Sequence, residues 1–178
     1  MLHNYSDNYN NIILEPLEEC HIEKMRKLRN RNRMSFINSN LIAETEQIAW
    51  FQKYLKKKDD YMFSIMRKSD DQFVGVVGLY NVCKSEAEFG RLMIDKEIVK
   101  EKGYGYDTLL CTCNIGFNQL NLDKIILEVW EENIPAFKTY LKAGFIVVEQ
   151  KVLENSKVLY YMEISKAKFD GLELHLEK

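Results

Sequence analysis

Hydrophobic residues recur along the chain with two different periods, and each period predicts one kind of secondary structure. Apolar side chains spaced three and four residues apart predict four helices, over residues 18–33, 44–57, 106–120 and 133–143. Alternating or continuous apolar runs bounded by turn residues predict seven strands. The first lies within 11–19 and ends at Pro16, and the others cover 61–68, 72–82, 86–95, 124–130, 145–153 and 157–164. The order is strand, two helices, three strands, helix, strand, helix and two strands, which is typical of mixed α/β proteins.

Turn residues add local expectations to this order. The sequence SDDQ at 69–72 predicts a hairpin between the strands on either side of it. Gly90, inside the strand 86–95, indicates a β-bulge or a close backbone approach. The chain has only two prolines and no Ser/Gly-rich linker, so nothing divides it into separate domains. We expect one domain over residues 11–178, preceded by a loose leader at residues 1–10.

The composition is that of a globular protein, with 46% hydrophobic and 12% aromatic residues. Its 25 basic and 27 acidic residues nearly cancel, so no global charge favours nucleic acid or membrane, and any anion site must be local. Neither an apolar signal core nor a run of ~18 apolar residues occurs, which predicts a cytoplasmic protein. The four cysteines and three histidines lack the spacing of metal ligands, so we expect free thiols and no metal site.

A short glycine turn, KEKGYGYD at residues 100–107, lies between the strand 86–95 and the next helix. The first N–H groups of a helix have no partner within it, and the helix dipole adds about half a positive charge there. Gly103 and Gly105 can adopt conformations closed to other residues, while Lys100 and Lys102 add positive charge. The turn therefore suits a pyrophosphate, although a Gly-x-Gly turn can also be only a tight connection.

A second motif, NIPAFKTYLKAGF at residues 133–145, predicts a short helix with one distinctive face. Asn133 is a good N-cap, and Gly144 is a good C-cap. Asn133, Ala136 and Tyr140 are spaced three and four residues apart, so they share one face of the helix. That face can form the wall of a site, or Ala136 and Tyr140 can simply be packing residues.

Together the two motifs resemble those of the GNAT superfamily of acetyl-CoA-dependent N-acetyltransferases, with K-x-x-G-x-G followed about thirty residues later by N-x-x-A-x-x-x-Y-x-K-x-G-F. The resemblance covers roughly residues 11–165 and is most specific over 86–145. It is greatest to enzymes that acetylate ribosomal-protein N-termini, polyamines and amino sugars. It implies a single α/β domain with a central twisted mixed sheet of about six to seven strands, flanked by about four helices.

The resemblance also implies how acetyl-CoA, the cosubstrate, would bind. Backbone groups near Met93 and Ile94 would hold the pantetheine arm, with Asn133 and Ala136 on its other side. Tyr140 would point its hydroxyl at the sulfur. Amides of the glycine turn would hold the pyrophosphate, through Lys100, Glu101, Lys102, Gly103, Tyr104, Gly105 and Tyr106. The family usually has Arg or Gln where this chain has Lys100, and Gly where this chain has Glu101.

In this family the amine attacks the thioester directly, so Cys111 and Cys113 need no catalytic role. Direct attack needs a neutral amine, a polarised carbonyl and a proton for the departing thiolate. Tyr140 suits the last task, because a tyrosine with its ordinary pKa near 10 is protonated at neutral pH, and a strand N–H near Met93 could polarise the carbonyl. Glu88 is the candidate base, a structural salt bridge is its alternative role, and Glu128 or bound water are competing bases.

The resemblance places the acceptor between the first two helices and the last strands. Arg29, Arg33 and Trp50 are candidate substrate contacts, together with Glu88. Arginines at a helix end can bind an anionic acceptor or can lie in solvent beside the helix dipole, and Trp50 can instead pack the helix. The run from Arg29 through Phe36 to Trp50 is similar to enzymes acting on nucleotide-linked amino sugars and on ribosomal-protein N-termini.

Two function classes therefore stay open. The first is an N-acetyltransferase, a monomer or homodimer, whose partner is a small-molecule or peptide amine and neither nucleic acid nor membrane. The second is a non-catalytic acyl-CoA sensor, which needs the phosphate cradle but has no use for the proton of Tyr140.

Overall fold

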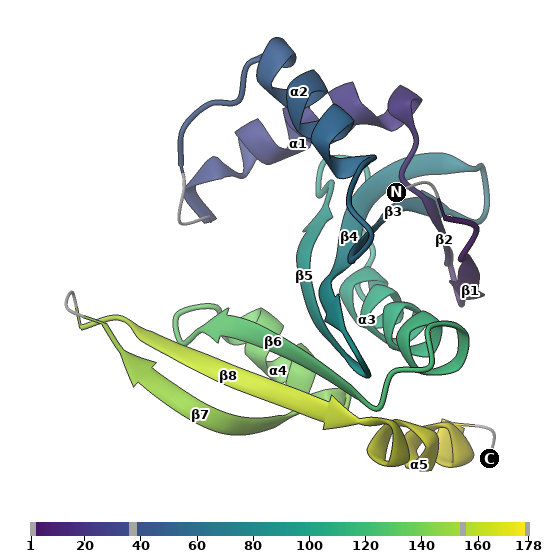
Figure 1. Cartoon of the computed structure of the whole chain (residues 1–178), viewed down its shortest axis with the longest axis vertical. Coiled ribbons are helices and arrows are strands. Elements are labelled where there is room, and N and C mark those ends of the chain that lie inside the picture. The colour runs from purple at the N-terminus through teal and green to yellow at the C-terminus, as the bar shows by residue number, and fades with distance from the viewer. Residues whose placement is uncertain (1–2, 36–38, 154–155, 177–178) are drawn as a thin grey trace.

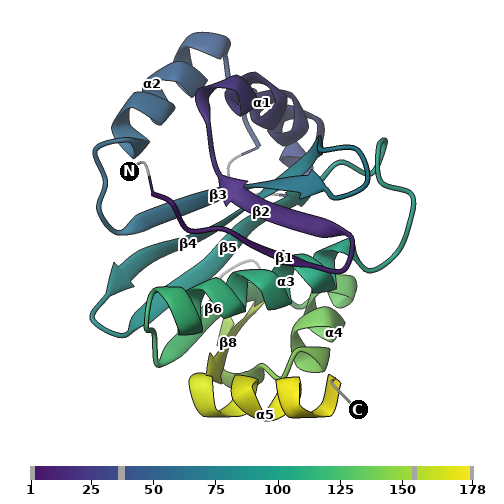
Figure 2. The ribbon, with the colours of Figure 1, turned by 90° about the vertical axis from the view of Figure 1, so that its right-hand side faces the viewer.

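A mixed β-sheet forms the centre of the molecule, and helices cover both of its faces (Figures 1 and 2). The computed structural model describes residues 3–35, 39–153 and 156–176. Within these ranges the sheet has eight strands in the order β1-β2-β3-β4-β5-β6-β8-β7. β5 and β6 pair in parallel, and the other neighbouring strands pair antiparallel.

The elements alternate along the chain much as the hydrophobic periods predict. The strands are β1 (Asp7–Tyr9), β2 (Ile12–Pro16), β3 (Asp60–Arg67), β4 (Gln72–Cys83), β5 (Glu86–Ile94), β6 (Lys124–Trp130), β7 (Ile146–Val152) and β8 (Val158–Ser165). The helices are α1 (Ile22–Arg31), α2 (Glu44–Tyr54), α3 (Tyr104–Asn114), α4 (Ile134–Lys142) and α5 (Lys166–Leu176), and a π-helical turn, Ile115–Gln119, continues α3. The predicted mixed α/β fold is confirmed, as is the hairpin of β3 and β4.

The loose leader predicted for residues 1–10 is wrong, because part of this segment belongs to the sheet. Strand β1 pairs with β2 through a turn at Asn10, whose φ is 45°. The Asn114 amide of α3 donates to Asp7 at 2.7 Å, and the Asn10 amide donates to Asp107 at 3.1 Å. His3 is buried. The polar composition of residues 1–10 therefore did not predict β1, a strand that side-chain hydrogen bonds join to α3.

Two hydrophobic cores lie on opposite faces of the sheet. α1 and α2 cover one face, where Leu28 and Phe51 are buried. α3 covers the other face, with Leu109 fully buried, and α4 and α5 lie on the same side (Figure 2). Along β3, Met62 enters the first core and its neighbour Phe63 the second, so the strand is buried on both faces. Helix α5 was not among the predicted elements.

Candidate active site

A β-bulge in β5 redirects this strand at the centre of the candidate site. The register between β4 and β5 shifts between Val76 and Gly78, where two residues of β5 oppose one residue of β4. Arg91, in the bulge, has a left-handed φ of 54°. The bulge predicted at Gly90 is confirmed, and a Cβ atom there would lie 2.6 Å from the Tyr80 side-chain hydroxyl oxygen.

Strands β5 and β6 separate soon after they begin. Parallel pairing joins the segment Glu86–Glu88 to the segment Lys124–Ile126. Each strand continues beyond these pairs, and Figure 1 shows them diverging, with β5 rising toward α1 and α2 while β6 runs beside β8. Backbone N–H and C=O groups on diverging edges need partners other than each other. A ligand that lies between the two strands can supply such partners.

The backbone of β5 after the bulge has one side toward β4 and one side toward this opening. The Met93 carbonyl oxygen lies toward β4, only 2.2 Å from where a Cβ of Gly75 would stand. The Asp95 N–H donates to Val74 of β4 at 2.8 Å. Because backbone groups alternate sides along a strand, the N–H and C=O groups of Leu92 and Ile94 face the opening. Of the two residues expected to hold the pantetheine arm through their backbone, Ile94 therefore faces the opening and Met93 does not.

The glycine turn ends at Gly103, which is the N-cap of α3 and has φ 110° and ψ −28°. This left-handed conformation favours glycine and lets the chain turn sharply into the helix. Gly105 lies inside the helix, where an added Cβ would make an ordinary contact of 3.8 Å with Ile94 Cδ1. Tyr104 is buried in the core, so only its backbone is available to a ligand.

Lysines from two elements lie near the first turn of α3. Lys100, Glu101 and Lys102 are exposed in the preceding loop, and Lys100 Nζ donates to the Lys96 carbonyl at 3.0 Å. The Lys142 ammonium of α4 lies 4.0 Å from the centre of the Tyr106 ring. Sequence reasoning missed Lys142, which comes to α3 only because α3 and α4 pack together.

Helix α4 presents Tyr140 to the point where β5 and β6 separate. The Asn133 carboxamide caps the helix by accepting a hydrogen bond from the Ala136 N–H at 3.4 Å, and Gly144 follows with φ 87°, so both predicted caps are confirmed. The Tyr140 ring lies 6.0 Å from both the Phe89 and the Phe145 rings, centre to centre. Burial raises the pKa of Tyr140 to about 12, so its hydroxyl holds a proton over the whole neutral range.

Glu88 lies directly opposite Tyr80 in the β4–β5 register. Its two carboxylate oxygens accept hydrogen bonds from the Tyr80 hydroxyl at 2.5 Å and from the Asn81 amide at 3.0 Å. The alternative role expected for Glu88 is a structural salt bridge. Among the described residues, its hydrogen-bond partners are these two neutral groups and not a cation. Partial desolvation, together with the nearby negative charge of Glu88, raises the pKa of Glu128 on β6.

A cavity of about 230 Å³ opens between α1, α2 and β5. It brings together two of the predicted substrate contacts, Arg29 and Trp50, with the Met93 side chain, and its other lining residues are Met25, Ile42, Gln47 and Arg91. Arg33, also predicted to bind the acceptor, is not among the lining residues, and Phe36 lies outside the described residues. Burial lowers the pKa of the Arg29 guanidinium.

Long-range contacts shape this cavity, and sequence reasoning missed them. The Asn30 side chain holds Ile42 by two hydrogen bonds, one to its carbonyl at 2.9 Å and one from its N–H at 2.8 Å. Arg91 Nη1 donates to Asp60 at 2.7 Å, and its guanidinium lies 4.0 Å from the centre of the Tyr80 ring. The bulge signal at Gly90 could have pointed to Arg91, whose side chain the bulge directs toward α1 and α2.

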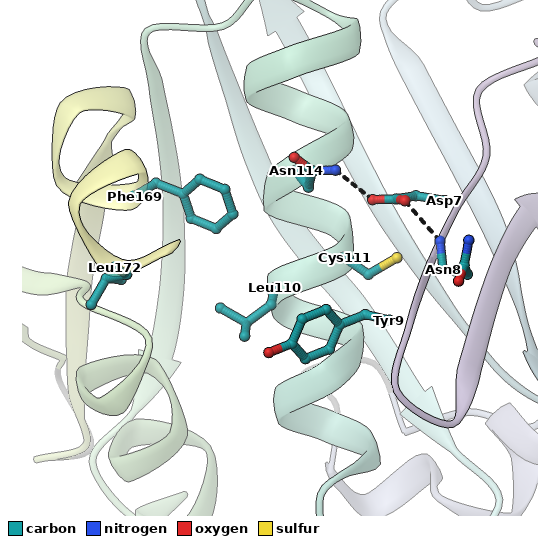
Figure 3. A pocket seen from close by; sticks show the side chains of 8 residues that line it. All are labelled: Asp7, Asn8, Tyr9, Leu110, Cys111, Asn114, Phe169 and Leu172. Carbon is teal, nitrogen blue, oxygen red and sulfur yellow. Dashed lines mark hydrogen bonds between the residues drawn. The ribbon is translucent and has the colours of Figure 1, made fainter. Parts of the chain in front are cut away.

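A second cavity, of about 80 Å³, lies between β1, α3 and α5 (Figure 3). Its lining combines Asp7, which Asn114 binds, with apolar side chains such as Phe169. Burial raises the pKa of the Cys111 thiol in this lining, so Cys111 is a poor nucleophile. None of the residues that line this cavity belongs to the candidate active site.

The described residues contain no group of three or more His, Cys, Asp or Glu side chains arranged to hold a metal ion. All four cysteines are free thiols. Across the same ranges, none of the helices has both the length and the apolar character needed to cross a membrane.

Comparison with known proteins gives a consistent family. The model of the acetyltransferase (GNAT) domain matches residues 11–146. A curated relative, the probable N-acetyltransferase YjcK of Bacillus subtilis (strain 168), is 26% identical over 145 residues, which cover 75% of this chain and 80% of YjcK.

Two solved structures share the fold. One is spermidine N-acetyltransferase from Vibrio cholerae, in complex with CoA and spermine. It superposes with a TM-score of 0.80 at 24% identity, and the alignment covers 89% of this chain and 98% of the Vibrio cholerae chain. Apo FdhC, a nucleotide-linked sugar GNAT, gives a TM-score of 0.82 at 21% identity and covers 98% of both chains. Because the family model matches well over half of the sequence, this chain belongs to the GNAT acetyltransferase family.

Proposed function

We propose that this protein transfers the acetyl group of acetyl-CoA to a primary amine by direct attack of the amine on the thioester. The observation that carries the proposal is the position of Tyr140, which α4 holds against Phe89 where β5 leaves β6. One end of the opened strand thus has a protonated phenol, and the other end leads through Gly103 into the N-terminus of α3.

The start of α3 and the open edge of β5 would hold acetyl-CoA in the way that the family resemblance implies. The first amides of α3, from Gly103 to Tyr106, would bind the diphosphate, and Lys100, Lys102 and Lys142 would add positive charge. The open edge of β5 at Leu92 and Ile94 would hydrogen-bond the pantetheine arm. The Vibrio cholerae neighbour, whose structure is a complex with CoA, supports CoA binding by this fold.

Three groups of this chain then serve the transfer. The Glu88 carboxylate, held by Tyr80 and Asn81, accepts a proton from the acceptor ammonium directly or through water, which leaves the nucleophilic amine. A backbone N–H on the open edge of β5 polarises the thioester carbonyl. The Tyr140 hydroxyl gives its proton to the departing thiolate.

The acceptor is a nucleotide-linked amino sugar, a polyamine or a protein N-terminus. The names of two structural neighbours support the first two of these acceptors. One neighbour is a spermidine N-acetyltransferase, and the other is a nucleotide-linked sugar GNAT. A cytoplasmic location and a monomeric or homodimeric state stay predictions.

Release of free thiol from acetyl-CoA, measured with a panel of these amines, tests the proposal. The wild type should release thiol with at least one amine, and the Tyr140→Phe variant should bind acetyl-CoA while releasing thiol much more slowly. If acetyl-CoA binds but no amine supports turnover in either form, the sensor alternative holds and the proposal fails.

A further inference from the structure

The charges around the acceptor cavity differ from one end of the site to the other. Two guanidiniums, those of Arg29 and Arg91, line the cavity between α1, α2 and β5, and none of its lining residues is acidic. At the other end, where β5 and β6 separate, lie the carboxylates of Glu88 and Glu128, close enough for Glu88 to raise the pKa of Glu128. The lining of the cavity is therefore basic, and the two carboxylates lie where β5 and β6 separate.

The carboxylate that pairs with Arg91 lies outside the cavity lining and also pairs with a lysine. Asp60, whose side chain is 3% exposed, accepts from Arg91 at 2.7 Å and from Lys57 at 3.1 Å. One carboxylate thus serves two cations. Tyr80 contacts both charges, because the Arg91 guanidinium lies 4.0 Å from the centre of its ring and its hydroxyl donates to Glu88.

From this polarity we propose that the acceptor is an amine carrying an anionic group, as in an amino sugar linked to a nucleoside diphosphate, and that Arg29 and Arg91 bind the anion. This inference rests on the proposed acetyltransferase function and selects among its acceptors. Guanidiniums bind phosphate oxygens in paired, charge-assisted hydrogen bonds. The apolar side chains of Trp50 and Met25 supply a wall for the less polar part of the acceptor.

A polyamine fits this arrangement poorly. Its first ammonium could lie near Glu88, but its remaining ammonium groups would enter a cavity lined by two guanidiniums. Like charges brought together in a partly desolvated site repel each other. A neutral peptide N-terminus would meet no such repulsion, but it offers no anionic group to the two guanidiniums.

The test compares kcat/KM at saturating acetyl-CoA for four acceptors: a nucleoside-diphosphate-linked amino sugar, the same sugar without the nucleotide, spermidine and an alanine-starting peptide. The wild type should prefer the nucleotide-linked sugar by about tenfold or more, which is the loss expected when a charge-assisted hydrogen bond is removed. That preference should shrink as salt is added, because salt screens the charges.

Arg29→Gln should lower kcat/KM for the nucleotide-linked sugar about tenfold and leave that for the free sugar within about twofold. Lys27→Gln is the matched control, because Lys27 is an exposed cation on the same helix outside the cavity, and it should change neither value.

A preference for spermidine or the peptide, or equal losses for both sugars in Arg29→Gln, would overturn the inference while leaving the acetyltransferase function intact. The wild-type comparison decides the question even if the variant does not fold. Absence of turnover with all four amines would instead contradict the proposed function, and this inference with it.

Discussion

The Tyr80 hydroxyl donates a 2.5 Å hydrogen bond to Glu88 from the directly opposite position of the neighbouring strand. Burial raises the pKa of Tyr80, so its hydroxyl keeps the proton that it donates. The same ring lies 4.0 Å from the Arg91 guanidinium, measured to its centre. Tyr80 thus joins the proposed base to the basic cavity, and Gly90 makes room for it.

Gly90→Ala should disturb this connection, because the new Cβ would stand 2.6 Å from the Tyr80 hydroxyl oxygen. Tyr80 would have to move, and the charged Glu88 carboxylate would lose the hydrogen bond that the Tyr80 hydroxyl donates to it, so we expect kcat to fall about tenfold. Steady-state kinetics measure the effect. Tyr80→Phe is the control, since it removes the same hydrogen bond without a clash and should lower kcat by a similar factor. A Gly90→Ala variant with wild-type kcat would mean that the Tyr80–Glu88 contact does not matter for turnover.

Tyr140→Phe should lower kcat about 100-fold or more, the usual contribution of a positioned general acid. The ring keeps its contacts with Phe89 and Phe145, so the fold and the affinity for acetyl-CoA should change little. Turnover and a calorimetric titration on the same preparation separate the two effects. Equal kcat in the variant and the wild type would remove Tyr140 from the mechanism.

Glu88→Gln should lower kcat about 100-fold, and it should also lower the pKa of Glu128. The sign follows from charge: a nearby carboxylate disfavours the ionised form of Glu128, and removing that charge lets Glu128 ionise at lower pH. Nuclear magnetic resonance titration of the Glu128 carboxyl carbon measures the shift. If Glu128→Gln abolishes turnover while Glu88→Gln does not, the two carboxylates have exchanged roles.

The fold should lose stability in alkaline solution because of its buried tyrosines. Burial raises the pKa values of Tyr54 and Tyr140 to about 12, above the ordinary value near 10. The folded state therefore holds these protons more tightly than the unfolded state does. Their stabilising effect is complete below pH 10 and is lost as the pH rises from about 10 to 12.

Thermal unfolding between pH 8 and pH 11 follows this loss. The unfolding midpoint should fall above pH 10, and it should fall less steeply in Tyr140→Phe, which lacks one of the two groups. Identical slopes in the wild type and the variant would show that Tyr140 does not titrate as proposed.

Gly103→Ala should destabilise the protein by about 1 kcal/mol, because an L residue at φ 110° is strained. It should also weaken acetyl-CoA binding, since the strained turn no longer directs the first amides of α3 in the same way. Chemical denaturation without ligand gives the stability change. Gly105→Ala is the matched control: its Cβ has ordinary space inside the helix, so no loss of stability is expected.

Sequence patterns were sufficient where the structure depends on neighbours along the chain. Helix α4 was predicted with both ends because Asn133 and Gly144 act within a few residues of the helix that they close. Gly90 marked the bulge because the lack of a Cβ has a direct geometrical use there. The glycine turn likewise predicted an unusual backbone conformation at Gly103, whose φ is 110°.

Contacts between distant segments could not be predicted in this way. Strand β1 resembled a loose leader because its polar residues bind α3 about a hundred residues later, as Asp7 binds Asn114. The cavity combines side chains of α1, α2 and β5, and Arg91 enters it only because the bulge redirects its side chain. Lys142 reaches the start of α3 through helix packing, which no spacing reports.

The central claim is that α3 and α4 bind opposite ends of one cosubstrate. Two calorimetric titrations test it most directly, one with acetyl-CoA and one with S-acetylpantetheine, which lacks the diphosphate. Acetyl-CoA should bind saturably with one molecule per chain, and S-acetylpantetheine should bind about tenfold or more weakly because it cannot use the α3 terminus. No saturable heat with acetyl-CoA, or equal affinity for the two compounds, would contradict the account.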